Sequence, residues 1–204
     1  NNSLRADNGR MGGSGDAGYA GVVLKHQDGP WVYAASVSGG YGSYDLGRTI
    51  GIDGYDRQAN SSPDVYSAGM RLRVSRHIGV SEHFYLKPYV DLDALYARMP
   101  SYTESGGPLS LHVDSSDQFV VGVSPMLEIG GQVDLSQGAT MRPYAYAGAS
   151  FLSDDSWDAQ ARFKGAPAGS DGFTTTLPGD NVIGRFGVGL QVNNRSGLDF
   201  RLQY

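Results

Sequence analysis

The sequence predicts an all-β fold, an antiparallel barrel that spans a membrane with its strands. Apolar residues recur at every second position in eight segments, and the connections between these segments alternate between short and long. Alternation with a period of two is typical of a strand with two unlike faces. The 204 residues include 30 Gly and 13 Tyr, which suits closely spaced, curved strands with aromatic rings near the membrane interfaces.

The alternation is clearest in the last segment. There Leu198, Phe200 and Leu202 share one face, and Asp199 and Arg201 share the other. The segments predicted as strands are 19–26, 31–41, 66–76, 84–98, 119–129, 142–152, 182–192 and 198–204. Gly, Ser and Ala separate the charges on the polar face, which favours a crowded, hydrated lumen over a solvent-exposed surface.

The connections between the predicted strands fall into two classes. The short ones are 28–30, 79–83, 134–141 and 193–196. The long ones, rich in the Gly, Ser, Pro and Asp of irregular chain, are 46–63, 99–118 and 158–180. A transmembrane barrel has tight periplasmic turns and long outer loops. The strict alternation therefore predicts a membrane orientation, whereas a soluble meander has no reason to sort its loops.

Composition argues against several other classes of protein. The net charge is −5 and the pI about 5.2, so we expect no nucleic-acid partner. The sequence has no Cys, which argues against a disulfide scaffold and a Cys-ligated metal site. No cofactor or metal is expected. The mean hydropathy of −0.32 is compatible with a membrane barrel, because only alternate residues face lipid.

Five stretches in order resemble the C-terminal translocator β-domain of autotransporters, the type V secretion proteins. They are 29–35 (GPWVYAA) followed by 48–50 (RTI), 86–90 (LKPYV) leading to 102–107 (YTESGG), 141–145 (MRPYA), 161–167 (ARFKGAP) and 186–190 (FGVGL). The resemblance implies a twelve-stranded barrel in the outer membrane of a Gram-negative bacterium, which exports and anchors its own N-terminal passenger. It also implies insertion by the barrel-assembly machinery and contact with outer-membrane lipid.

The resemblance and the loop pattern together predict that residues 1–204 are a partial barrel domain. If the short turns are periplasmic, the segment 198–204 runs outward, so one more strand must return the chain to the periplasm. The eight segments would then be the fourth to eleventh of the family barrel. We expect the first three strands, a lumen helix and the passenger upstream, and any signal peptide also lies outside these residues.

Most charged residues of the predicted strands fall on the polar face, which we expect to line the lumen. These lumen-facing candidates are Lys25, Arg71, Arg73, Lys87, Asp91, Asp93, Glu128, Arg142, Arg185, Asp199 and Arg201. Two interpretations stay open: the charges contact a linker segment during export, or they pair with one another and have structural value alone. Glu104, in the stretch best matched to the family, is the candidate to anchor an outer loop into the barrel mouth, unless it is an exposed loop carboxylate.

The sequence does not predict an enzyme. Strand parity sends His26 to the lipid face, His77 and His83 to a periplasmic turn and His112 to an outer loop, so the histidines do not converge. Ser110, His112 and Asp114 lie two residues apart along one strand, which is not the geometry of a catalytic triad.

Two alternatives remain open at this point. A complete eight-stranded outer-membrane barrel, acting as a structural or adhesion protein, would have enough strands to close, but its long loops would face the periplasm. A soluble, lipocalin-like carrier would instead enclose a lumen lined by apolar side chains.

Overall fold

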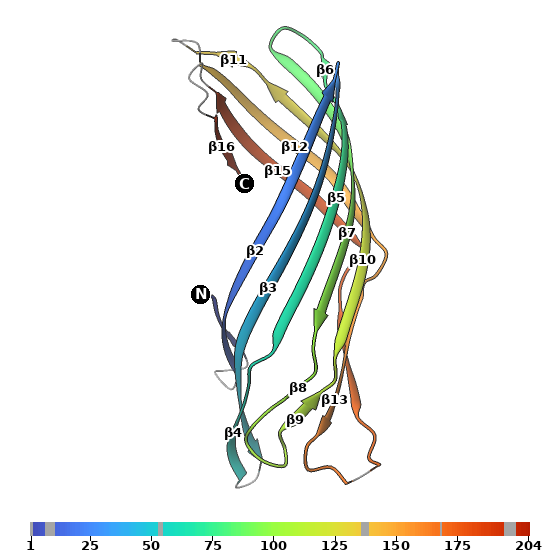
Figure 1. Ribbon diagram of the computed structural model, residues 1–204. Helices are drawn as coiled ribbons and strands as arrows, with labels where there is room; N and C mark the ends of the chain where they lie inside the picture. Colours follow the sequence, from blue (N-terminus) through green and yellow to red (C-terminus); the bar gives the residue numbers. More distant parts are fainter. Residues whose placement is uncertain (1, 7–10, 53–54, 136–138, 168, 194–198) are drawn as a thin grey trace.

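The computed structural model describes residues 2–6, 11–52, 55–135, 139–167, 169–193 and 199–204. They form an all-β structure in which long antiparallel strands curl side by side into an open half-barrel (Figure 1). These residues contain no helix that is long and apolar enough to cross a membrane.

A main sheet contains the long strands. They are β2 (Met11–Asp28), β3 (Trp31–Ile52), β5 (Asp64–Arg76), β7 (Phe84–Met99), β10 (Ser116–Gly131), β12 (Thr140–Leu152) and β15 (Val182–Asn193). The short strands of this sheet are β1 (Asn2–Ala6), β4 (Tyr55–Ser61), β6 (Ile78–Gly79), β11 (Val133–Asp134) and β16 (Asp199–Gln203). The order across the sheet is β1-β2-β3-β5-β7-β10-β12-β15-β16, with β4, β6 and β11 paired beside β3, β7 and β12.

The eight predicted strands are confirmed: each overlaps β2, β3, β5, β7, β10, β12, β15 or β16. The first hairpin shows how local chemistry sets the register. Asp28 pairs with Trp31 across the two-residue turn Gly29–Pro30. Gly29 has φ +53°, as the first central residue of a type II′ hairpin turn requires. This turn fixes which side chains of β2 and β3 share a face.

The prediction that the long connections are irregular was wrong. β3 continues through 46–52 and pairs with β4, so the first long connection is largely a hairpin. The other two contribute a second sheet of β8 (Tyr102–Thr103), β9 (Leu111–Val113), β13 (Ser156–Phe163) and β14 (Phe173–Pro178). Residues 173–178 read FTTTLP, and their Thr content favours a strand. The surrounding Gly, Pro and Asp obscured that signal.

The first predicted strand, 19–26, also begins earlier than expected. β2 starts at Met11, and β1 pairs with its first residues from Met11 to Gly15. Residues 11–18 read MGGSGDAG, which has too few side chains to show an alternation. A Gly-rich strand of this kind is therefore invisible to a hydrophobicity pattern.

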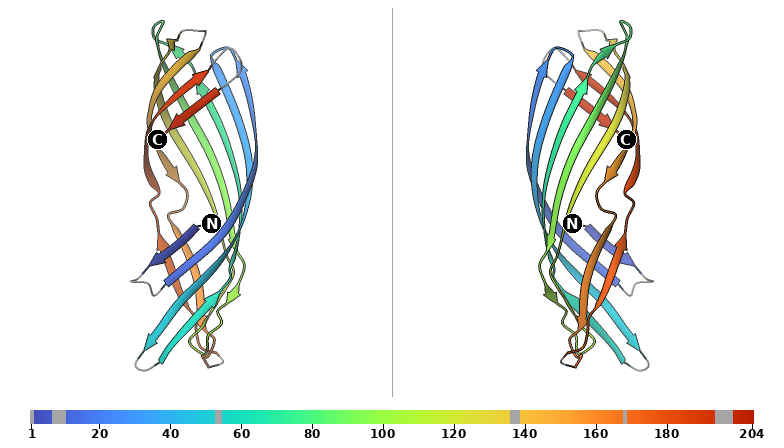
Figure 2. Two further views of the ribbon diagram at one scale, coloured as in Figure 1. Left: turned by 90° about the vertical axis from the view of Figure 1, so that its left-hand side faces the viewer. Right: turned by 90° about the vertical axis from the view of Figure 1, so that its right-hand side faces the viewer.

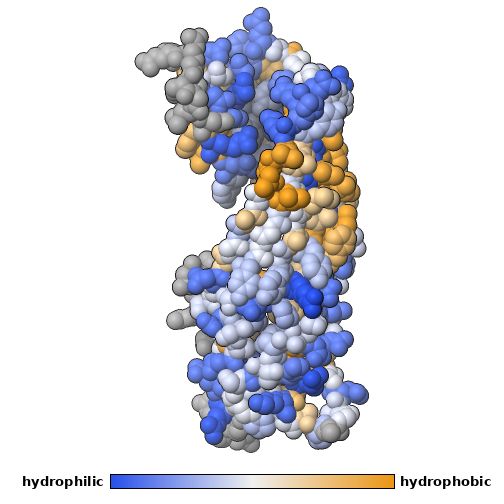
Figure 3. All heavy atoms as spheres, viewed as in Figure 1, coloured by the Kyte–Doolittle hydropathy of each residue, from blue (hydrophilic) through white to orange (hydrophobic). Residues whose placement is uncertain are grey.

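The outer face of the main sheet is apolar. Phe186 is 84% exposed, and Val22, Val37 and Leu127 are also largely exposed. Apolar residues form a belt between polar ends of the molecule (Figure 3). Exposed apolar surface in such a belt is typical of contact with lipid.

Aromatic residues mark both margins of this belt on the outer face. Trp31 and Tyr33 lie near the short turns, whereas Tyr41 and Tyr66 lie further along, with ring centroids 5.2 Å apart. From Trp31 to Tyr41, at ~3.3 Å per residue, β3 runs ~33 Å, which a strand tilt of ~40° reduces to a height of ~25 Å. That height matches the apolar band of a transmembrane barrel.

On the inner face, tyrosine rings lie over glycines of the neighbouring strand. A Cβ placed on Gly189 would lie 2.2 Å from Cζ of Tyr144, and a Cβ on Gly187 would lie 2.5 Å from Cζ of Tyr146. Both are register partners of β12 and β15. The glycines provide the room that the flat rings need, and the rings cover backbone that lacks side chains of its own.

Among the described residues, no pairing joins β1 to β16, so the main sheet is open. β1 pairs with β2 toward the long-loop end, whereas β16 pairs with β15 toward the short-turn end. Figure 2 shows both edge strands along the open side of the half-barrel. The β2 edge over 16–28 and the β15 edge over 182–187 are therefore not covered by any described strand.

Candidate functional site

The inner wall of the half-barrel carries cross-strand ion pairs. Arg73 Nε donates to Asp91 Oδ1 at 2.6 Å, and its Nη2 donates to Asp91 Oδ2 at 2.7 Å. One step along the same pair of strands, Arg71 Nε donates to Asp93 Oδ1 at 2.5 Å. Both pairs are direct register partners of β5 and β7. The antiparallel register therefore places each cation opposite a carboxylate.

The two neighbouring pairs differ in burial. The Asp91 side chain is 0% exposed, whereas those of Asp93 and Arg71 are 28% and 44% exposed. The Arg73 guanidinium also lies over the ring of Tyr89, 4.3 Å from its centroid. A buried carboxylate needs such a bidentate cation, because isolated charges are costly to remove from water.

A third pair joins the next two strands. Lys87 Nζ donates to both oxygens of Glu128 at 3.0 Å, and the Tyr85 hydroxyl donates to Glu128 Oε1 at 2.9 Å. Lys87 and Glu128 are register partners of β7 and β10. The ion pairs thus extend across three adjacent strands of the wall.

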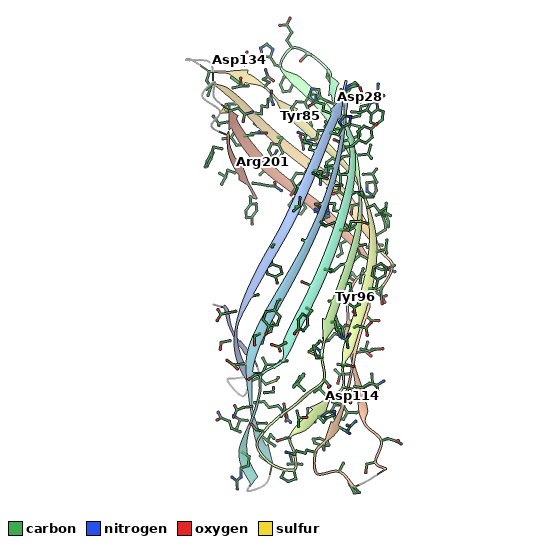
Figure 4. All side chains as sticks on the ribbon, viewed as in Figure 1. Asp28, Tyr85, Tyr96, Asp114, Asp134 and Arg201 are labelled. Atoms are coloured by element: carbon green, nitrogen blue, oxygen red, sulfur yellow. The ribbon has the colours of Figure 1, made fainter. Side chains whose placement is uncertain are left out.

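Beyond these pairs, the inner face contains a hollow of about 600 Å³ at the short-turn end. It is lined by Lys25, Arg142 and Arg201 as well as by Lys87 and Glu128. Tyr85 and Arg201 lie at this end of the sheet in Figure 4. Among the described residues, neither Lys25 nor Arg142 pairs with a carboxylate, so this end of the wall carries excess positive charge.

The eleven predicted lumen-facing residues differ in their surroundings. Six form the three ion pairs, Lys25, Arg142 and Arg201 line the hollow, and Arg185 lies on β15 opposite Gly148. The side chain of Asp199 lies outside the described residues. Sequence parity did not give the partners of the six paired residues. Whether they contact an exported segment stays a prediction.

Glu104 lies at the opposite end, in the connection between β7 and β10. Its carboxylate accepts hydrogen bonds from Arg48 Nε at 2.9 and 3.1 Å and from Arg48 Nη2 at 2.7 Å. The backbone N–H of Leu111 donates to Glu104 Oε2 at 2.8 Å, and Arg48 Nη2 donates to the carbonyl of Leu109 at 3.0 Å. Glu104 is buried, so it is not an exposed loop carboxylate.

These contacts connect the second long connection to the extended part of β3. The hydrogen bonds that Arg48 donates to Glu104 raise the pKa of the Arg48 guanidinium, which therefore stays charged. Burial, and next the Glu104 charge, raise the pKa of the Tyr102 phenol beside it. Backbone hydrogen bonds between Asn60 and Ser105 add a second connection. Sequence reasoning does not identify Arg48 as the partner of Glu104, because no spacing rule relates the two residues.

The histidines occupy separate places. His26 stacks on Tyr33 with ring centroids 6.4 Å apart, whereas His77 and His83 both line the hollow at the short-turn end. His112 lies in β9, with Nδ1 2.6 Å from Thr103 Oγ1 and Nε2 3.4 Å from Asp114 Oδ1.

Ser110 lies close to His112 in the sequence. Its Oγ is buried and has no hydrogen-bond partner among the described residues, so no hydrogen bond joins it to His112. The described part of the chain also has no group of three or more His, Cys, Asp or Glu side chains that could hold a metal ion.

Long antiparallel strands, an apolar outer belt and a charged inner wall define an outer-membrane β-barrel. The soluble-carrier alternative is wrong, because the apolar face points outward and the ion pairs point inward. The profile of the autotransporter beta-domain matches residues 1–204, so the chain belongs to the autotransporter β-domain family. A search of curated proteins found no match. Membership places the domain in the outer membrane of Gram-negative bacteria as a translocator barrel.

Proposed function

We propose that the charged inner wall forms a hydrated path along which the N-terminal passenger segment crosses the outer membrane. The observation that carries this proposal is the inward position of the Arg73–Asp91, Arg71–Asp93 and Lys87–Glu128 pairs beneath an apolar outer belt. Paired charges keep water along the wall without presenting a strong net field at that level. An extended, hydrated polypeptide can pass such a surface without losing its own hydration.

Further strands of the full-length protein would close the barrel. The uncovered edges of β2 and β15 support this part of the proposal, since unpaired backbone groups are costly in lipid. The proposed strands lie outside residues 1–204. If β2 to β16 provide the fourth to eleventh strands of the barrel, β1 would belong to the third. The barrel-assembly machinery would insert the complete barrel, and outer-membrane lipid would contact the apolar belt.

Glu104 and Arg48 would hold the second long connection against the barrel mouth. Their burial and their multiple hydrogen bonds support this role, because a flexible loop at that position would obstruct the exit of the passenger. The domain would act without catalysis of its own. The histidines support that view, because they lie in three places and only His77 and His83 share one.

Cysteine cross-linking tests the path directly, because residues 1–204 contain no Cys. A single cysteine at Lys25 or Arg142 in the full-length protein is expected to cross-link to a cysteine in a passenger that is stalled during export. The matched control is a cysteine at Leu127, which lies on the outer face of the same barrel. Cross-linking from Leu127 but not from either inner position would refute the proposed path.

A further inference from the structure

The second sheet, formed by β8, β9, β13 and β14 and called the outer sheet below, carries a row of polar side chains that the translocation path does not use. Thr103 of β8 is the register partner of His112 of β9, and His112 is in turn the register partner of Arg162 of β13. Three adjacent strands thus place a hydroxyl, an imidazole and a guanidinium side by side. Asp114, labelled in Figure 4, lies at this end of the molecule, far from the short turns.

Asp114 holds two members of this row in place. Its Oδ1 lies 3.4 Å from His112 Nε2 and accepts a hydrogen bond from Arg162 Nη1 at 3.2 Å. Thr103 Oγ1 lies 2.6 Å from the other ring nitrogen, Nδ1 of His112. Both nitrogens of the imidazole are therefore in contact, which fixes the orientation of the ring. A guanidinium has five N–H donors, so Arg162 keeps several that Asp114 does not use.

A pocket of about 430 Å³ lies against this row. Thr103, His112, Arg162 and Lys164 line it on the sheet side, and the turn that follows β13 contributes Ser170. Asp114 itself does not contribute to the lining. Among the described residues, Lys164 forms no ion pair, so the pocket wall carries two cations and no carboxylate.

Two backbone hydrogen bonds hold Lys164 and its neighbour in place. The N–H of Lys164 donates to the carbonyl of Ser110 at 2.8 Å, and the N–H of Gly165 donates to the carbonyl of Pro108 at 2.8 Å. The connection between β8 and β9 therefore holds the backbone of two residues at the pocket in place. A preorganised site loses less conformational entropy when it binds a ligand.

We propose that this pocket binds an oxyanion of the phosphoryl class. Phosphoryl oxygens accept charge-assisted hydrogen bonds from guanidinium and ammonium groups, and Arg is suited to bind two oxygens at once. Thr103 and His112 add polar surface to the lining, although both nitrogens of the imidazole already contact Thr103 and Asp114. The described lining contains no acidic side chain, because Asp114 contacts Arg162 and His112 without lining the pocket.

The phosphoryl group can come from free phosphate or from a phosphorylated lipid headgroup. The pocket lies at the long-loop end, which the proposed orientation turns toward the cell surface. Access to a lipid headgroup of the outer leaflet rests on that orientation. The binding of free phosphate does not, so it can be tested independently of export.

The experiment uses the refolded full-length protein in phosphate-free detergent micelles, titrated with inorganic phosphate in a calorimeter. Arg162→Gln and Lys164→Gln are each expected to weaken binding about tenfold, which corresponds to ~1.4 kcal/mol. Arg57→Gln is the matched control, because Arg57 is an exposed arginine of β4 at the same end of the barrel. Since the Lys164 side chain forms no ion pair within the described part of the chain, its substitution tests the site without removing such a contact.

A second arm presents the protein in phosphatidylcholine nanodiscs with or without phosphatidic acid, whose headgroup is a phosphate monoester. Competition of phosphatidic acid with inorganic phosphate would assign the site to a lipid headgroup, and its absence would assign it to free phosphate. Equal phosphate binding by the wild type and all three variants would overturn the proposal, as would no binding by the wild type. Neither result would bear on passenger cross-linking.

Discussion

The ion pair on the inner wall and the ion pair at the barrel mouth bury their carboxylates similarly but connect different parts of the chain. Arg73 and Asp91 are 18 residues apart and face each other across β5 and β7. Arg48 and Glu104 are 56 residues apart and join β3 to a loop. The first pair follows from strand register, whereas the second depends on how a loop folds back. Strand register thus determines which charges pair on the inner wall, whereas a contact between distant parts of the chain determines the pair at the barrel mouth.

The difference also predicts which part of the molecule loses stability when a charge is removed. The wall pair lies within the continuous ladder of the main sheet, so its loss affects the barrel as a whole. The mouth pair lies outside the apolar belt, so its loss affects the loops first. Local and global stability can differ in this way within one structure.

The largest effect is expected for Asp91→Ala. It leaves the Arg73 guanidinium beside a site from which water is excluded, which costs about 3 kcal/mol. The measurement is urea unfolding of the refolded full-length barrel in micelles. Asp93→Ala is the matched control. The Arg71–Asp93 pair is more exposed, so this substitution should cost only ~0.5 kcal/mol. Equal losses for the two variants would remove burial as the cause.

A smaller and more local effect is expected for Glu104→Gln. The amide keeps the shape but loses the charge that Arg48 requires, at a cost of about 2 kcal/mol. Limited proteolysis should show faster cleavage between 99 and 118, while the unfolding midpoint of the barrel changes little. Glu82→Gln, at an exposed short turn, serves as the control. A large drop in the global midpoint would show that the mouth and the wall unfold together.

The smallest effect is expected for Gly189→Ala, which tests a register contact that involves no ion pair. The new methyl group displaces the Tyr144 ring, and this overpacking costs about 1 kcal/mol. Gly184→Ala on the same strand is the control, because a Cβ there meets nothing within 4 Å. Samples are heated to a series of temperatures before gel electrophoresis, and the temperature at which the folded band disappears measures the loss of stability. An equal loss at Gly184 would point to backbone flexibility rather than to the ring.

The sequence predicted the wall better than the mouth, for a physical reason. Period-two alternation assigned Arg73, Asp91 and Lys87 to one face before any strand was paired. It could not assign partners, because pairing Lys87 with Glu128 requires the register between β7 and β10. Arg48 was not recognised as a partner of Glu104, since loop contacts have no period.

The outer sheet was missed for a related reason. Its strands are short, and Thr-rich residues 173–178 stand between Gly and Pro, which normally mark irregular chain. Their pairing with β13 is decided by tertiary contact. The row of Thr103, His112 and Arg162 depends on the pairing of β8 with β9 and of β9 with β13, so it could not be found from sequence spacing.

The length of β3 has a mechanical consequence. It runs without interruption from Trp31 to Ile52, pairs with β2 and β5 in the apolar belt and then with β4 beyond it. A pull on the outer hairpin along this direction loads the β3 hydrogen bonds in shear, so many must break together. A ladder pulled from one end, by contrast, opens one bond at a time. The barrel is therefore built to bear tension applied at its outer rim.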